Sequence, residues 1–148
     1  MTSGLLFSAI AFVGGILLAV QAPTNALVGR AAGSPLMAAL ISFAVGIVAL
    51  GAMALATGTA RWTPEMRALP PYVWLGGLYG AFFVAAAAFL APRIGAGALL
   101  TAAIAGQLLA GLVLDRYGLL GLPRHDLSLP RIAGAVLVLA GAALVGRS

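Results

Sequence analysis

The spacing of the charged residues constrains this chain more than any other feature. Charged side chains make up only 7% of its 148 residues, and 63% of the residues are hydrophobic. Five stretches carry no charge at all, namely residues 1–29, 31–60, 68–92, 94–114 and 132–146. A helix needs roughly 20 apolar residues to cross about 30 Å of hydrocarbon. Four stretches meet this requirement, and the fifth meets it if its helix begins near Leu127 and Arg131 snorkels to the interface.

This pattern predicts an all-α integral membrane protein with five transmembrane helices. Soluble domains carry about 25% charged residues, and a chain with so few could not cover itself in water. The first stretch lacks a basic start and is too long for a signal core, so we expect it to be retained. We predict one transmembrane domain over residues 1–148, with helices at about 3–30, 35–57, 72–90, 96–115 and 128–145.

Proline and glycine place the expected breaks between these helices. Pro23 removes a backbone donor, which predicts a kink or break in the first helix. Ser34 and Pro35 are typical of a helix start, with serine as the cap and proline at the first position. We expect short connections near residues 31–34 and 91–95, and longer loops at 58–71 and 116–127.

The basic balance of the chain does not indicate nucleic acid. The net charge of +5 comes from arginine alone, and each arginine lies in a loop or at the end of an apolar run. Such positions are typical of interfacial anchors and topology signals. With five spans, five arginines fall on the side of the amino terminus and three on the other, which weakly favours a cytoplasmic amino terminus. So small a margin is also what a protein that inserts in both orientations would show.

No catalytic or metal-binding constellation is apparent. The chain has no cysteine, and its three acidic residues and one histidine lie outside the helix centres. Glu65, His125 and Asp126 belong to loops, and Asp115 ends a helix. No Ser-His-Asp set, paired carboxylates or metal-ligand spacing occurs at membrane depth. We therefore expect no enzymatic activity, no metal and no cofactor.

Uncharged polar residues in the first helix are the main candidates for a site. Gln21 and Asn25 lie four residues apart and so share one face. Pro23, between them, leaves a backbone carbonyl without its usual donor. Amides at membrane depth need partners or water. Two interpretations remain open: the amides line a substrate cavity, or they hydrogen-bond a neighbouring helix and hold the bundle together.

Weaker candidates lie on the other helices. Gln107, Gly111 and Asp115 share one stripe of the fourth helix, which indicates either a second cavity wall or interhelical packing. Asp115 is a candidate coupling acid only if it does more than face the interface. Ser42 and Tyr79 are further candidates for the cavity, although a membrane serine often bonds only its own backbone.

Small residues predict close packing of helices. Gly76 and Gly80 share one face of the third helix, and Gly134 and Gly141 lie on the last. Lipid provides no hydrophobic drive for helix association, so faces of small residues must supply it. We regard these four glycines as candidates for helix packing or a dimer interface.

Several motifs also resemble a known family, in the same order along nearly the whole chain. They are Val20-Gln21-Ala22 with Asn25, Gly33-Ser34-Pro35, Ile41-Ser42-Phe43, Trp74-Leu75-Gly76-Gly77, Ala91-Pro92-Arg93-Ile94-Gly95 and Gly106-Gln107-Leu108. The chain resembles the YdcZ-like inner-membrane proteins of the drug/metabolite transporter superfamily. This resemblance implies a multi-pass protein of the bacterial inner membrane that transports small molecules.

The last helix is also similar to the dimerising helix of the small multidrug resistance proteins. Those relatives have four helices and work as antiparallel dimers. Their first helix carries an essential glutamate, whereas this chain has Gln21 and Asn25 and no acid there. Proton-coupled export by their mechanism is therefore in doubt. Two oppositely oriented chains of five helices would match the ten-helix inverted-repeat exporters of the superfamily.

These observations favour a transporter subunit that works by alternating access in an antiparallel dimer. The dimer would be formed by two copies or with an oppositely oriented paralogue, and a small metabolite or drug-like molecule would bind near the bilayer midplane. Gln21, Asn25, Gln107, Ser42 and Tyr79 are the predicted lining residues. Two alternatives remain: an exporter that uses Asp115 as its coupling acid, or a structural subunit that transports nothing.

Overall fold

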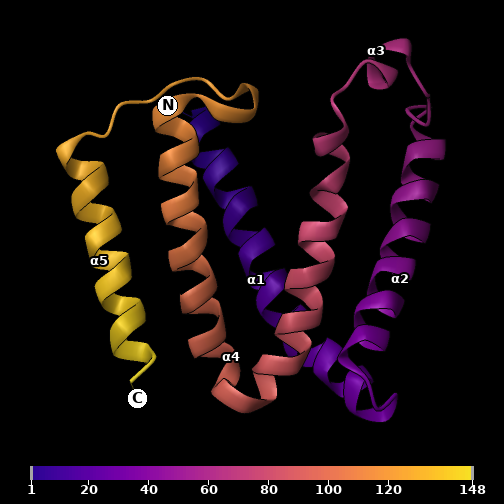
Figure 1. The fold of residues 1–148 in the computed structure, drawn as a ribbon, viewed down its shortest axis with the longest axis horizontal. Helices are drawn as coiled ribbons and strands as arrows, with labels where there is room; N and C mark the ends of the chain where they lie inside the picture. The colour runs from indigo at the N-terminus through magenta and orange to yellow at the C-terminus, as the bar shows by residue number, and fades with distance from the viewer. Residues whose placement is uncertain (1, 148) are drawn as a thin grey trace. The chain divides into compact units, whose positions relative to one another are not determined.

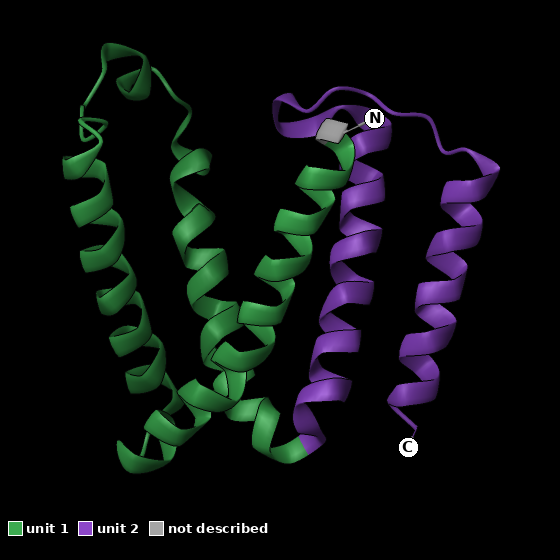
Figure 2. Cartoon of the chain, turned by 180° about the vertical axis from the view of Figure 1, so that it is seen from behind, with its two compact units in different colours: residues 1–93 green, residues 94–148 purple. Residues whose placement is uncertain are grey.

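The structure, a computed structural model, describes residues 2–147, and every regular element in that range is helical (Figure 1). The elements are α1 (Thr2–Ala31), α2 (Pro35–Ala56), α3 (Pro64–Arg67), the 3-10 turn η1 (Pro71–Leu75), α4 (Gly76–Tyr117), the 3-10 turn η2 (Leu119–Gly121) and α5 (Leu129–Val145). The chain forms two compact units, residues 1–93 and 94–148 (Figure 2). The boundary between them falls inside α4.

Three helical segments are long and apolar enough to cross a bilayer. They are Gly4–Ala31, Pro35–Ala56 and Pro71–Tyr117, and α5 is a shorter apolar helix of 17 residues. Most of their large hydrophobic side chains are exposed along the whole length of each helix. An exposed apolar surface of this extent is stable in lipid and would be unfavourable in water. The helices and their apolar surface therefore confirm the predicted class, an all-α membrane protein.

The corner between α1 and α2 forms as the sequence predicts. Gly33 takes a left-handed φ of +70°, which glycine adopts without strain, and turns the chain. Ser34 is extended, and its Oγ accepts a hydrogen bond from the Met37 backbone N–H at 3.4 Å. Pro35 occupies the first turn, where its missing N–H costs nothing. The cap and the proline together fix where α2 begins.

The predicted break at Pro23 is not observed. Helical structure runs through Pro23 from Thr2 to Ala31. Thr24, the next residue, donates its hydroxyl hydrogen bond to the Val20 carbonyl at 2.8 Å, one turn back. Pro23 leaves the Ala19 carbonyl, four residues back, without its usual donor, and the Thr24 bond does not replace it. A proline removes only this one ladder bond, so the helix continues through it.

The break in α4 is narrower than the predicted connection at residues 91–95. The sequence predicts that one helix ends at Leu90 and the next begins at Ala96. Helical structure instead continues through Pro92, and within α4 only Gly95 leaves the helical region, with φ 80° and ψ 152°. Glycine alone takes this conformation readily. The predicted start at Tyr72 also differs, since residues 71–75 form η1 and α4 begins at Gly76.

The segment between α2 and α4 is held by an aromatic contact. Trp62 and Trp74 stack with ring centroids 5.6 Å apart and planes 13° apart. Offset aromatic stacking contributes about 0.5–1.5 kcal/mol beyond area burial. Tryptophan is enriched at the boundary between membrane and water. The stack closes the loop that carries α3.

Among the titratable groups of residues 2–147, Glu65, in α3, is the one with a clearly shifted pKa. Hydrogen bonds from its own backbone N–H and then from the Thr63 side chain lower the pKa of this exposed carboxyl. A lowered pKa in the folded state adds stability above the unfolded-state pKa. That contribution is lost as the pH falls through the folded value. The loop is therefore expected to loosen only under acidic conditions.

We expect Thr63→Val to raise the pKa of Glu65 toward its ordinary value without fully restoring it, because the larger backbone contribution remains. Glu65 is the only glutamate in the sequence, so ¹³C-glutamate labelling gives one carboxyl signal to titrate by NMR in micelles. Thr59→Val is the matched control, since Thr59 bonds Thr57 and the Ala54 carbonyl instead. An unchanged pKa in Thr63→Val would contradict this assignment.

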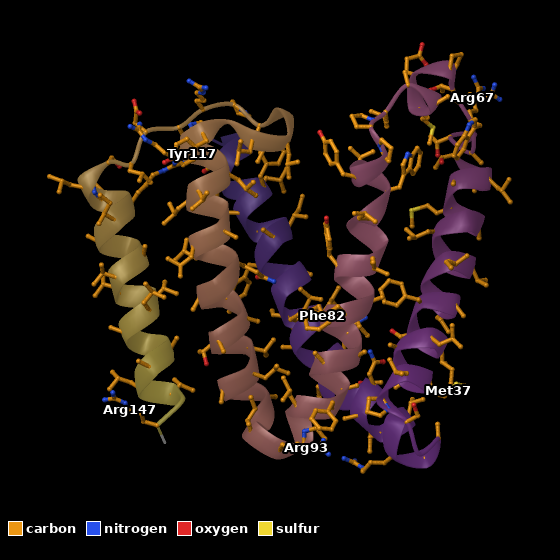
Figure 3. All side chains as sticks on the ribbon, viewed as in Figure 1. Met37, Arg67, Phe82, Arg93, Tyr117 and Arg147 are labelled. Atoms are coloured by element: carbon orange, nitrogen blue, oxygen red, sulfur yellow. The ribbon has the colours of Figure 1, made fainter. Side chains whose placement is uncertain are left out.

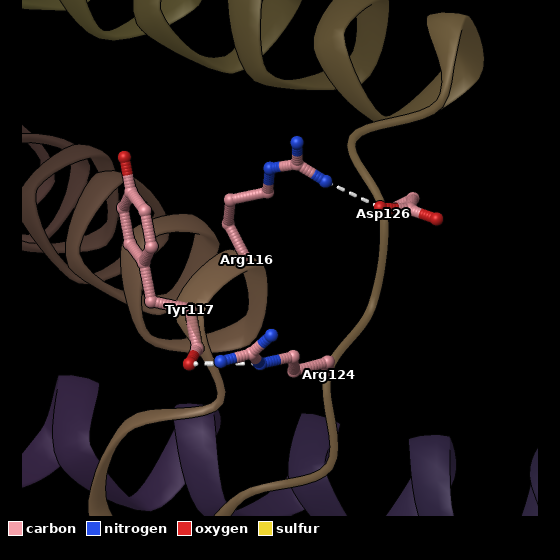
Figure 4. A network of polar contacts seen from close by, with 4 residues as sticks. All are labelled: Arg116, Tyr117, Arg124 and Asp126. Atoms are coloured by element: carbon pink, nitrogen blue, oxygen red, sulfur yellow. Dashed lines mark hydrogen bonds and ion pairs between the residues drawn. The ribbon is translucent and has the colours of Figure 1, made fainter.

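In the second unit, the loop after α4 folds back over the end of that helix. Gly118 is left-handed with φ 62° and ends the helix. The His125 backbone N–H donates to the Asp115 carbonyl at 2.9 Å, and Arg124 Nε donates to the Tyr117 carbonyl at 3.3 Å. Arg116 and Asp126 form an ion pair in the same network (Figure 4). Final helix carbonyls that lack intrahelical partners are satisfied in this way.

Candidate functional site

The candidate site begins with a polar contact between α1 and α2. Gln21 Nε2 donates to Ser42 Oγ at 3.4 Å, and the pair is partly buried. The contact borders a pocket of about 210 Å³, whose other lining residues are Phe43, Gly46, Ile47 and Leu50. The sequence predicts Gln21 and Ser42 as lining residues, but their direct contact could not be predicted. The pocket is otherwise apolar, so these two groups give it its polarity.

Asn25 lies one turn further along α1 and is the one buried polar residue among the described side chains. It is 7% exposed, and its neighbours Ala22 and Ala26 are equally buried. Its side-chain amide makes no hydrogen bond to any residue of the described chain. An amide that is fully enclosed without a partner costs about 1–3 kcal/mol in proteins, but no side-chain atom of the described residues is enclosed in this way. The polar atoms of Asn25 therefore keep some accessible surface, through which water, a ligand or another subunit can reach them.

The two remaining predicted lining residues do not line the pocket that holds Gln21 and Ser42. Tyr79, on α4 of the first unit, is 65% exposed and lies outside the pocket that holds Gln21. Gln107, in the second unit, lines a groove of about 630 Å³ between α4 and α5. Gly111 and Asp115 line the same groove, as the predicted stripe requires. The two roles proposed for this stripe, cavity wall or packing face, both remain predictions.

Asp115 has a charged partner of its own. Its carboxylate accepts a hydrogen bond from the Arg131 guanidinium at 3.4 Å, and both side chains are partly exposed. An acidic residue at the carboxyl end of a helix is disfavoured by the helix dipole, and a partly exposed ion pair of this kind contributes only about 0–1 kcal/mol. The contact joins α4 to the first turn of α5. The geometry therefore gives Asp115 a packing role within the second unit.

The four candidate glycines differ in what surrounds them. A Cβ at Gly80 would lie 3.4 Å from the Phe43 ring, so Gly80 lets α2 pack closely within the first unit. A Cβ at Gly76, Gly134 or Gly141 would meet no atom within 4 Å in the described chain. These three positions leave open helix surface. Lipid or a second chain can occupy it.

Sequence reasoning missed a second polar pocket in the first unit. Arg30 and Arg93 line the same pocket of about 490 Å³, near the corner between α1 and α2. The sequence analysis interpreted both arginines as interfacial anchors only. One feature of the sequence could have indicated this pocket: each arginine ends an apolar run and follows a glycine or a proline.

The described residues hold no group of acidic, histidine or cysteine side chains suited to a metal ion. The side chains of Gln21 and Ser42, which meet, and of Asn25, one turn away on α1 and outside their pocket, are uncharged amides and a hydroxyl. Such groups donate and accept hydrogen bonds but neither transfer protons near neutral pH nor attack as activated nucleophiles. The arrangement can therefore bind and select a small polar molecule.

Comparisons with known proteins agree with this description. Residues 6–144 match the family described as "Putative inner membrane exporter, YdcZ". The chain is 32% identical over 134 aligned residues to the "Inner membrane protein YdcZ" of Escherichia coli (strain K12). The alignment covers 90% of this chain and 89% of that protein. No solved structure matches the chain with significance.

Proposed function

The chain belongs to the YdcZ family of multi-pass inner membrane proteins, and from that membership we propose that it is a transporter subunit rather than an enzyme. The proposed cargo is a small metabolite or drug-like molecule. It moves by alternating access in an antiparallel dimer. The family match covers almost the whole chain, and the family is described as a putative exporter. This description supports transport as the activity.

One observation carries the proposed site. Asn25 is 7% exposed, its amide has no hydrogen-bond partner in the described chain and is not fully enclosed, and it lies one turn from the hydrogen bond between Gln21 and Ser42. Uncharged polar groups between two apolar helices cost free energy unless they form hydrogen bonds. A substrate that exchanges hydrogen bonds with these three side chains would satisfy the amide of Asn25. We propose that they form the substrate contact.

The charge of the chain bears on the substrate. Of the three acidic residues of the sequence, only Glu65 belongs to the first unit, and it lies in α3, beyond the carboxyl end of α2, the helix that carries Ser42. A cationic substrate at Gln21 would find no counter-charge near it within this unit, at high free-energy cost. The proposed substrate at this site is therefore neutral. The ion pair with Arg131 leaves Asp115 a poor coupling acid.

We propose five spans per chain, which the helix lengths support. At 1.5 Å per residue the 47-residue segment Pro71–Tyr117 would be about 70 Å long, more than twice the hydrocarbon thickness of about 30 Å. It fits a bilayer as two spans, with the turn at Gly95, where the helical torsion angles fail. With α1, α2 and α5 this makes five. The open helix surfaces at Gly76, Gly134 and Gly141 support a second, oppositely oriented chain.

The orientation can be tested because the chain has no native cysteine. Ala32→Cys and Ala60→Cys place single thiols beyond the two ends of α2, hence on opposite sides of the membrane. In an antiparallel homodimer, a membrane-impermeant maleimide should label about half of each variant in intact cells. Labelling of only one variant would show a single orientation and would rule out the homodimer.

Transport itself is tested in liposomes that contain the purified chain. We expect uptake of labelled neutral polar solutes that saturates with concentration and shows counterflow when the liposomes are preloaded with the same solute. Liposomes with the Gln21→Ala and Asn25→Ala double variant are the matched control. Solute movement equal to that of protein-free liposomes, across a broad solute panel, would favour the non-transporting structural subunit.

A further inference from the structure

The pocket with Arg30 and Arg93 combines two kinds of lining residue. The two arginines line it beside a set of small and apolar residues. The other lining residues are Ala26, Gly29, Gly33, Pro35, Ala88, Phe89 and Pro92. Its volume of about 490 Å³ lies within the range of ligand sites, about 300–1,000 Å³. The pocket therefore combines positive charge with an apolar wall.

Neither arginine has an acidic partner among the described residues. Residues 2–147 contain two ion pairs, Arg116–Asp126 and Arg131–Asp115, and both lie in the second unit. The single acid of the first unit, Glu65, follows the far end of α2, a helix of 22 residues that is about 33 Å long. Arg93 and Met37 lie at one end of this unit and Arg67 at the other (Figure 3). The positive charge of the pocket is uncompensated.

The Arg93 side chain is held in place before any ligand arrives. Its guanidinium carbon lies 3.5 Å from the centroid of the Phe89 ring, and one N–H group donates to the Phe89 carbonyl. The remaining N–H groups of this planar fork stay available, in a geometry that matches phosphate oxygens. Pro35, in the first turn of α2, also lines this pocket. The amino-terminal end of a helix carries a partial positive charge, which favours an anion.

We propose that this pocket binds a phosphate oxyanion, and that the phosphate is the headgroup of an anionic phospholipid. The two guanidinium groups take the phosphate oxygens. The alanines and Phe89 provide an apolar wall for the adjoining glycerol and acyl carbons. Both arginines end apolar runs, where headgroups lie in a bilayer. This inference does not depend on which molecule the protein transports.

The test is a lipid titration of the full chain in dodecyl maltoside micelles. We expect phosphatidylglycerol to bind at least tenfold more tightly than phosphatidylcholine, whose headgroup has no net charge. Inorganic phosphate is titrated in parallel to distinguish the source of the oxyanion. Binding of phosphatidylglycerol alone supports the lipid headgroup. Binding of inorganic phosphate alone supports the oxyanion site and overturns the lipid as its source.

The variants separate this site from general charge attraction. Arg30→Gln with Arg93→Gln should weaken phosphatidylglycerol binding at least tenfold. Arg61→Gln with Arg67→Gln removes the same charge beyond the other end of α2 and should change it less than twofold. Arg30→Gln alone should weaken binding about threefold or more, and it removes no hydrogen bond or ion pair of the described chain, so the fold is kept. Equal weakening in both double variants, or wild-type binding in Arg30→Gln with Arg93→Gln, would overturn the proposal.

Discussion

Replacing the two amides of α1 together, as Gln21→Ala with Asn25→Ala, is expected to reduce flux by about tenfold to a hundredfold. A hydrogen bond contributes about 0.5–1.5 kcal/mol, and 1.4 kcal/mol is a factor of ten, so two lost substrate contacts give this range. Flux is measured in liposomes at low substrate concentration. Thr24→Ala is the matched control on α1, since the Thr24 hydroxyl binds only the Val20 carbonyl.

Changes that keep the side-chain shape distinguish a substrate contact from a packing contact. Asn25→Leu removes an amide that has no hydrogen-bond partner in the described chain, and it retains the branching of the side chain. If the amide serves the substrate, the thermal unfolding midpoint should stay the same or rise while flux falls, because function is then maintained at a cost in stability. If Asn25 instead bonds a second subunit, Asn25→Leu should weaken the dimer in parallel with flux. Wild-type flux with unchanged selectivity in the double alanine variant would show that the site lies elsewhere, and Gln107 would be examined next.

The second large effect is expected at the corner between α1 and α2. A Cβ at Gly29 would lie 3.5 Å from Pro35 Cα and 3.6 Å from Ala38 Cβ, which is ordinary contact. Gly29→Ala should therefore be tolerated. The two further methyl groups of Gly29→Val have no such space, and overpacking of this kind costs about 1–3 kcal/mol. We expect Gly29→Val to lower the folded yield and the unfolding midpoint in detergent.

Gly51→Val is the control for this prediction. Gly51 lies inside α2, and a Cβ there would meet no atom within 4 Å. The same substitution should leave stability nearly unchanged, because its methyl groups would face lipid. Equal loss of stability in both variants would indicate a general effect of valine in these helices. It would contradict the close packing of the corner that brings Gln21 to Ser42.

The helical membrane class could be predicted because it depends on local chemistry. Uncharged stretches long enough to cross a bilayer allow only a helix in lipid, where every backbone polar group must bond within the chain. The start of α2 could be predicted from Ser34 and Pro35 for the same reason, since capping involves adjacent residues. The sequence predicts a kink or break at Pro23; the break is absent, because proline weakens a membrane helix without ending it. The position of the break in α4 required the torsion angles of Gly95.

The faces that these helices bury were decided only by tertiary structure. In a soluble helix, an apolar stripe marks the buried side. Here apolar residues surround each helix, because lipid-facing and protein-facing positions are equally apolar, so the sequence alone marks no inner face. Tertiary packing therefore decided that Asn25 is buried while Tyr79 is exposed, and that Gln21 meets Ser42. It also brought Arg30 and Arg93, 63 residues apart in the sequence, to one pocket. The sequence by itself determined that the chain is a helical membrane protein of a known family, because charge spacing and motif order can be read without knowing which residues meet.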